Sequence, residues 1–260
     1  MALNPPMTQW HGCRVWLIGA STGIGLATAE ALHAAGATVT VSARKVAQLE
    51  QFVKTHPGAR ALPLDVTDAG AMARALESVC LDGVPDWVVY CAGHYRPMGA
   101  DTLDLAECLR HGDVNYRGFL YLLDALLPRW LRTPAHTHRH ISVVGSVAGY
   151  RGLPQSLAYG PTKAALINLA EALYLELQAR RIGVSLVNPG FVETPLTREN
   201  DFPMPALISP AQAAQAMLRG WAKGQFEIHF PRRFTWGMQL LRVLPYRIYF
   251  AITKRLLSRR

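Results

Sequence analysis

The stretch that decides the fold is LIGASTGIGLA, residues 17–27, where an apolar run passes through three glycines into an alanine-rich segment. The glycines are Gly19, Gly23 and Gly25, with the spacing G-x-x-x-G-x-G. Glycine lets a backbone turn sharply and approach a ligand closely. A turn from a strand into a helix also presents free N–H groups and the positive end of the helix dipole, which favour a pyrophosphate. A purely structural turn is the alternative interpretation.

Apolar segments rich in strand-forming residues recur along the chain, and alanine- and leucine-rich segments with helical spacing separate them. Continuous apolar strands are typical of a parallel sheet buried on both faces. Alternation of strands and helices predicts right-handed βαβ units. We therefore expect an α/β fold: a single Rossmann-type doubly wound domain with a seven-stranded, mainly parallel sheet flanked by helices. The seven expected strands are residues 14–20, 38–44, 60–66, 87–93, 140–146, 183–190 and 225–231.

Composition agrees with one globular unit. The chain has 260 residues, half of them hydrophobic, which is enough for a large core. We expect no signal peptide, because the first residues are neither basic nor apolar, and no membrane span. The four cysteines, Cys13, Cys80, Cys91 and Cys108, lack metal-binding spacing. We therefore expect reduced thiols, a cytoplasmic protein and no metal site.

The net charge of +9 is concentrated at the C-terminus. No acidic residue follows Glu227, whereas eight basic residues do, and the rest of the chain has 19 basic and 18 acidic residues. We expect a catalytic domain over 1–231 and a basic amphipathic appendage over 232–260, interrupted by Pro245. Such an appendage is typical of contact with an anionic membrane surface. A helix that packs over the substrate pocket or forms a subunit interface is equally consistent. We expect no nucleic-acid binding, because the body has no basic groove.

The ends of the second and third strands bear on the choice of dinucleotide. An acidic residue at the end of the second strand would bind the ribose hydroxyls of NAD. Here the residue is Arg44, which can pair with the 2′-phosphate of NADP. Asp65 and Val66 end the third strand, near the expected adenine site. The sequence therefore favours NADP(H) over NAD, although a solvated surface arginine is the alternative.

Tyr159 and Lys163 begin another apolar helical segment, and Ser146 lies 13 residues before the tyrosine. Together with the glycine spacing, this pattern resembles the short-chain dehydrogenase/reductase family over roughly 12–231. Asn115 in DVNYRG and the segment NPGFVETP, residues 188–195, add to the resemblance. Spacing of i, i+4 puts the tyrosine and lysine on one helix face, and a nearby ammonium favours a phenolate.

The resemblance implies a catalytic set of Asn115, Ser146, Tyr159 and Lys163. Tyr159 would exchange a proton with the substrate oxygen, Ser146 would hydrogen-bond that oxygen, and Lys163 would bind the nicotinamide ribose and lower the tyrosine pKa. Asn115 would hold a water in a proton relay. Besides Tyr159 and Lys163, the residues expected at the cofactor are Gly19, Ser21, Thr22, Gly23, Ile24, Gly25, Arg44, Asp65, Val66, Cys91, Ala92, Gly93, Pro189, Gly190, Val192 and Thr194. The chain has Cys91 where the family usually carries asparagine.

The residues expected to face substrate are mostly apolar, which predicts a small hydrophobic carbonyl or alcohol substrate. They are His94, Tyr95, Val147, Tyr150, Leu153, Gln155, Phe191, Leu196, Phe202, Met204 and Leu207. The predicted function is hydride transfer between nicotinamide and such a substrate. A non-catalytic NADPH-binding sensor or scaffold and a membrane-surface, lipid-directed reductase are the alternatives. The family resemblance also suggests a homodimer or homotetramer.

Overall fold

The computed structural model describes residues 2–132, 139–199 and 203–257, with the side chains of all of these except 199 and 255–257. A seven-stranded sheet with the order β3-β2-β1-β4-β5-β6-β7 forms its centre. Every pairing between these strands is parallel, which confirms the predicted fold class. The strands are β1 (Arg14–Ile18), β2 (Thr38–Ala43), β3 (Arg60–Pro63), β4 (Trp87–Tyr90), β5 (Arg139–Val144), β6 (Ile182–Pro189) and β7 (Glu227–Phe230).

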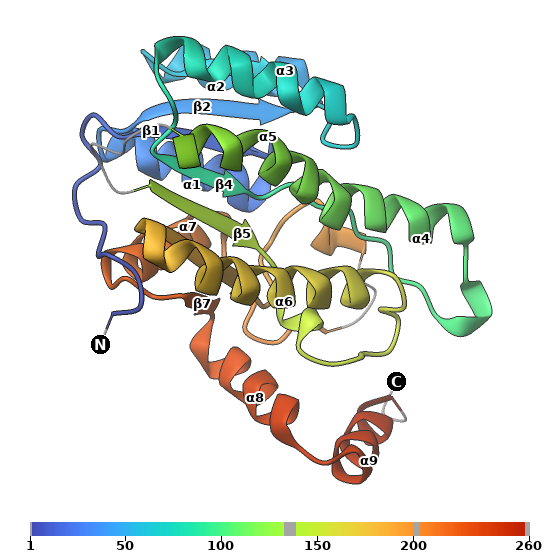
Figure 1. The fold of residues 1–260 in the computed structure, drawn as a ribbon. Helices are drawn as coiled ribbons and strands as arrows, with labels where there is room; N and C mark the ends of the chain where they lie inside the picture. The colour runs from blue at the N-terminus through green and yellow to red at the C-terminus, as the bar shows by residue number, and fades with distance from the viewer. Residues whose placement is uncertain (1, 133–138, 200–202, 258–260) are drawn as a thin grey trace.

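Helices cover the sheet on both faces (Figure 1). Alternate residues of β1 show how the layers form, because Trp16 and Ile18 join one core and Val15 and Leu17 the other. Helices α3 (Ala69–Val79), α5 (Gly118–Arg132) and α6 (Tyr159–Leu177) contribute to the first core. Helices α1 (Gly23–Ala34), α2 (Val46–Thr55) and α7 (Pro210–Ala222) contribute to the second. The short helix α4 (Leu105–Gly112) precedes α5 and is joined to it by one π-helical turn, Asp113–Arg117.

The C-terminal appendage forms two helices, α8 (Arg232–Val243) and α9 (Tyr246–Leu257), with Pro245 between them. Figure 1 shows both helices extending away from the sheet. Tyr249 anchors α9, because its ring is buried and its hydroxyl donates to the Gly152 carbonyl at 2.5 Å. The Arg151 guanidinium lies 4.2 Å from the centroid of that ring. Tyr249 of the appendage therefore packs against the body of the protein.

Among the described residues, no helix is both long enough and apolar enough to cross a membrane. The four cysteines are all free.

His140 is a buried titratable group in the middle of the sheet. Its ring stacks on Trp87 with centroids 3.8 Å apart, and its Nε2 lies 2.8 Å from the Ser185 hydroxyl. Burial lowers the pKa of His140 to about 3. The folded protein therefore holds this imidazole neutral at pH values where an unfolded chain protonates it.

We predict that this mismatch destabilises the protein in acid. Below pH ~6.5 the unfolded chain binds a proton that folded His140 does not, so stability falls as the pH falls toward 3. In that window, His140 alone should lower the free energy of unfolding by about 1.4 kcal/mol for each pH unit of acidification. Urea unfolding between pH 7.5 and 5 should show a shallower pH dependence in His140→Gln than in the wild type. Equal slopes in the two proteins would contradict the assignment.

Candidate active site

The glycine turn lies where β1 meets α1, and close contacts exclude side chains from it. Gly19 has a φ of +91°, and a Cβ there would lie 2.4 Å from the Ala92 backbone nitrogen after β4. A Cβ on Gly25 would lie 2.1 Å from the Gly19 carbonyl oxygen. Distances below 3 Å are incompatible with a side chain, so both positions require glycine. The turn thus fixes the start of α1 against the end of the sheet.

The N-terminus of α1 has backbone donors that no side chain caps. Its N-cap residue, Thr22, makes no side-chain capping bond, and its first turn contains no acidic residue. Side chains of Asp68, Asp104 and Ser209 cap α3, α4 and α7, whereas α2, α6 and α8 resemble α1 in having no capping side chain. Uncapped N–H groups and the helix dipole suit an anion. The pyrophosphate of a dinucleotide fits this end of α1, and Ser21, Thr22 and Ile24 lie in the turn around it.

Arg44, Asp65 and Val66 lie beyond the ends of β2 and β3. Burial raises the pKa of the Asp65 carboxyl, but hydrogen bonds from Thr67 and the charge of Arg44 outweigh it and leave the pKa below its usual value. Arg44 is exposed and Val66 is buried. The structure therefore brings Arg44 close to Asp65, as expected for residues at one end of a dinucleotide.

Asn115 lies in the π-helical turn between α4 and α5 and is fully buried. Its Oδ1 accepts from the His94 N–H at 2.7 Å. Its Nδ2 donates to the His94 carbonyl and to the Thr162 hydroxyl, each at 3.0 Å. One amide thus joins the segment after β4 to helix α6. π-Helical turns are frequent at functional sites because they re-aim side chains.

Lys163 reaches the same place from the second turn of α6. It is buried, and its Nζ donates to the Val144 carbonyl at 2.9 Å. The Nζ lies 5.5 Å from the centroid of the Tyr159 ring. A Cβ on Gly93 would lie 4.0 Å from this Nζ and 3.8 Å from the Asn115 Oδ1. Asn115, Tyr159 and Lys163 therefore converge beside Gly93, at the carboxyl end of β4.

Burial dominates the ionisation of the tyrosine and the lysine. It raises the pKa of Tyr159 to about 12, and a hydrogen bond with Ser146 acts in the opposite direction. It lowers the pKa of Lys163 to about 8. No lowering of the tyrosine pKa by Lys163 is evident in this arrangement. That family role stays a prediction for the cofactor-bound protein.

Ser146 follows β5 and caps the short 3-10 turn Val147–Gly149, accepting from the Ala148 N–H at 3.1 Å. This hydrogen bond from the backbone fixes the orientation of the Ser146 side chain. Cys91 follows β4, and its N–H donates to the Ile18 carbonyl at 2.8 Å. Burial raises the pKa of the Cys91 thiol to about 11, so it stays protonated at neutral pH. Backbone hydrogen bonding holds this position, where the family usually carries asparagine.

The segment after β6 meets the glycine turn directly. A Cβ on Gly23 would lie 2.9 Å from the Thr194 methyl group. Val192 is buried and forms a bridge with Ile208. The Gly190 N–H donates to the Phe230 carbonyl at 2.7 Å, just beyond Pro189. The glycine turn and the segment after β6, about 170 residues apart in the sequence, therefore form one wall of the candidate cofactor site.

Two tyrosines expected to face substrate, Tyr95 and Tyr150, lie in different surroundings. Tyr95 packs edge-on against Tyr159 with centroids 4.9 Å apart, so it lies beside the candidate catalytic residues, and its contact with substrate stays a prediction. Tyr150 is buried and donates to Glu227 at 2.5 Å, so it belongs to a polar cluster beneath α8. The expectation for Tyr150 is therefore wrong. Phe202 lies outside the described residues.

Two polar residues near Tyr159 are absent from the predicted site. The His111 ring lies 6.4 Å from the Tyr159 ring, and Glu107 bonds His94 at 2.6 Å. Their i, i+4 spacing is the only sequence signal, and it does not show that α4 packs beside Tyr159. A separate open groove of about 740 Å³ lies between α7 and β7, and none of the expected catalytic residues lines it.

Comparisons with known proteins agree with this geometry. The family model described as short chain dehydrogenase matches residues 14–203. An uncharacterized oxidoreductase of Myxococcus xanthus is 31% identical over 92% of this chain and 95% of its own length. The protein is therefore a member of the short-chain dehydrogenase family.

Two solved structures are also similar. A short chain dehydrogenase from Burkholderia cenocepacia, in complex with NADP, has a TM-score of 0.81 and 26% identity, covering 96% of this chain and 99% of that one. A 3-ketoacyl-(acyl-carrier-protein) reductase from Brucella melitensis, complexed with NADH, has a TM-score of 0.76 and 24% identity. It covers 86% of this chain and 99% of its own, and at that identity it supports the fold alone.

The glycine turn yields a direct test. Gly25→Ala should weaken dinucleotide binding, measured with NADPH as the probe, at least ~10-fold and lower the melting temperature, because the new methyl group would meet the Gly19 carbonyl. Gly237→Ala is the matched control, since a Cβ there meets nothing within 4 Å inside α8. The control should bind NADPH normally and be neutral or more stable. Equal NADPH affinities in the two variants would contradict this account of the turn.

Proposed function

We propose that the protein is an NADP(H)-dependent oxidoreductase that interconverts a small hydrophobic carbonyl compound and its alcohol. The observation that carries the proposal is the convergence of Asn115, Tyr159 and Lys163 beside Gly93, next to the uncapped start of α1. A non-catalytic NADPH-binding role would leave the Tyr159 hydroxyl in this buried set without a function. Lys163 in particular is a buried ammonium, which is costly to maintain.

In this mechanism the protein's own residues position the substrate and move its proton. A bound nicotinamide supplies or accepts the hydride. The Tyr159 hydroxyl donates a proton to the carbonyl oxygen in reduction, and in oxidation the Tyr159 phenolate accepts the proton from the alcohol. Ser146 hydrogen-bonds the same oxygen and favours developing negative charge on it. Lys163 stabilises the phenolate left on Tyr159, and Asn115 keeps Gly93 and α6 in register.

Removal of the Tyr159 hydroxyl tests the catalytic assignment. Tyr159→Phe should reduce kcat about 10²–10⁴-fold, because the proton loses its donor. NADPH affinity, measured by its fluorescence, should change little, since the ring and its packing remain. Ketones and aldehydes of rising chain length serve as substrates, with NADPH oxidation as the readout. A variant with full turnover would overturn the assignment.

The choice of NADP(H) rests on Arg44, which is exposed beyond β2 at the position where an acidic residue would favour NAD. An arginine can bind the 2′-phosphate by paired, charge-assisted hydrogen bonds. The complex of the Burkholderia cenocepacia relative with NADP is consistent with this choice.

Arg44→Ala should raise the KM for NADPH about 10-fold or more and leave the KM for NADH nearly unchanged, because only NADPH has the extra phosphate. Lys54→Ala, at an exposed position in the last turn of α2, is the charge-matched control and should change neither KM. If wild-type protein uses both cofactors equally well, Arg44 does not have the proposed role.

The cytoplasmic location that we propose is supported by four free cysteines. We also propose a homodimer or homotetramer, as the family resemblance suggests. Leu131 in α5 and Leu175 in α6 are exposed, and such side chains suit a contact between subunits.

For the appendage, here 232–260, we propose contact with an anionic membrane surface, which would make lipid-like carbonyl compounds accessible. Its inner face packs on the body through Tyr249, whereas several large apolar side chains remain exposed. These are Trp236, Leu240, Val243, Tyr246, Ile248 and Phe250, each at least 50% exposed. Exposed cations Arg233, Arg247 and Lys254 accompany them. Apolar and cationic groups together suit the interface of an anionic bilayer.

Co-sedimentation of the full chain with vesicles tests this contact. Binding should be stronger to phosphatidylcholine vesicles containing phosphatidylglycerol than to pure phosphatidylcholine, and weaker at high salt. The double variant Trp236→Gln with Phe250→Gln should weaken vesicle binding. The control is a second double variant, Leu105→Gln with Leu109→Gln, which changes two exposed leucines on α4 and should leave vesicle binding unchanged. If no vesicle binds, or if the first variant alters oligomeric state instead, the membrane proposal fails and a subunit interface replaces it.

A further inference from the structure

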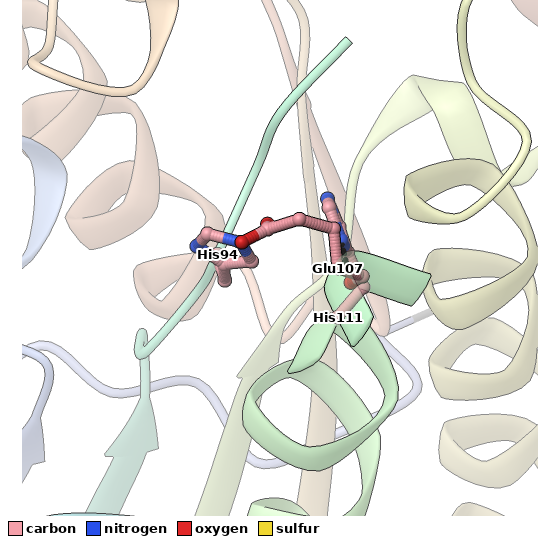
Figure 2. A group of neighbouring side chains, drawn as sticks. All are labelled: His94, Glu107 and His111. Carbon is pink, nitrogen blue, oxygen red and sulfur yellow. Dashed lines mark hydrogen bonds and ion pairs between the residues drawn. The ribbon is translucent and has the colours of Figure 1, made fainter. Parts of the chain in front are cut away.

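His94, Glu107 and His111 form a compact cluster beside the proposed catalytic residues. His94 follows Gly93 in the loop after β4, whereas Glu107 and His111 lie one turn apart on α4. Each residue offers one ligand atom, and these three atoms lie within 4.8 Å of one another. Figure 2 shows the Glu107 side chain reaching from α4 toward the His94 ring, with which it bonds at 2.6 Å.

We propose that these residues form a binding site for a divalent transition metal ion of the Zn²⁺ class, and that its occupation inhibits the enzyme. Two imidazole nitrogens and one carboxylate oxygen are donors that Zn²⁺ accepts readily. Tetrahedral ligands around Zn²⁺ lie about 3.3–3.5 Å apart, given metal–ligand distances of about 2.0–2.1 Å. The ligand atoms therefore need to move by about 1 Å, with the ion inserted between His94 and Glu107.

The hydrogen bonds of His111 orient its ring for this role. Its Nδ1 lies 2.7 Å from the Glu107 carbonyl, so Nδ1 carries the proton and Nε2 has the lone pair. Histidines that bind metals usually donate their other N–H to a carbonyl in this way. The Nε2 of His111 is therefore the atom that can act as a ligand.

Two features oppose the ion and limit its affinity. The His111 Nε2 accepts from the Arg96 N–H at 3.1 Å, and an ion must replace that bond. Arg96 is exposed in a loop, so its N–H can bond water instead. The Arg110 guanidinium lies 3.5 Å from Glu107, but it is half exposed and can turn away. We therefore expect micromolar rather than nanomolar binding.

Inhibition follows from the contacts between His94 and Asn115. Both the N–H and the carbonyl of His94 bond the Asn115 amide, which in turn bonds Thr162 on α6. An ion inserted between His94 and Glu107 must widen their 2.6 Å contact to about 3.3–3.5 Å, which pushes the His94 ring away from Glu107, displaces this backbone and loosens the catalytic arrangement. The binding part of the proposal stands on the cluster alone, whereas inhibition rests on the proposed function.

Isothermal titration of the full chain with Zn²⁺ tests binding, and visible absorption of added Co²⁺ reports the ligand set. We expect one ion per chain, with affinity at least ~10-fold lower in His94→Gln and in Glu107→Gln. His33→Gln is the matched control. His33 and His56 form another pair of histidines, with ring centroids 5.0 Å apart, and both are distant in the sequence from His94, Glu107 and His111. His33→Gln should bind as the wild type does.

The absence of saturable one-to-one binding would overturn the proposal, as would loss of binding in His33→Gln but not in His94→Gln. Circular dichroism confirms that each variant is folded. In turnover assays, Zn²⁺ should inhibit wild type and His33→Gln over the concentration range in which it binds, EDTA should reverse this, and Glu107→Gln should resist. Binding without inhibition would overturn the inhibitory role. If no carbonyl substrate is turned over, the proposed function fails while the titration still decides the metal site.

Discussion

The buried amide of Asn115 is the interaction on which the rest of the site depends. It bonds both backbone groups of His94 and the hydroxyl of Thr162, so one side chain joins the end of β4, the π-helical turn and α6. A buried amide must satisfy its donors and acceptor, and each misplaced partner costs about 1–3 kcal/mol. These elements are therefore held at a fixed spacing. Because Tyr159 and Lys163 lie on α6, the hydrogen bond between Asn115 and Thr162 also fixes their positions.

The glycine turn imposes the complementary constraint on the cofactor side. Gly19 and Gly25 bring β1, α1 and the end of β4 so close that no side chain fits between them. The start of α1 is left without a capping side chain, and Thr194 closes over Gly23. The two constraints meet at Gly93, where the glycine turn and the proposed proton-transferring groups are neighbours. In the proposed mechanism the carboxyl end of the sheet therefore holds both cofactor binding and chemistry, as in other open α/β sheets.

Local patterns predict the seven parallel strands and the glycine turn, because strand periodicity and glycine spacing depend on nearby residues. The position of α4 is different, since the packing of Glu107 and His111 beside His94 and Tyr159 depends on the path of the loop after β4. The inward packing of Tyr249 likewise requires Arg151 and Gly152, about 100 residues earlier. Tyr150 was misassigned for the same reason, because its partner Glu227 belongs to a distant strand. The π-helical turn at Asn115 has no signature in the local sequence.

The most direct test of the central claim is isotope transfer. Incubation of the wild-type protein with NADPH dideuterated at the nicotinamide C4 and a hydrophobic ketone, followed by mass spectrometry, shows where the label goes. The account predicts one deuterium on the carbinol carbon of the product, together with a primary isotope effect if hydride transfer limits turnover. Product without deuterium, or NADPH bound with no product from any ketone or aldehyde, would contradict it.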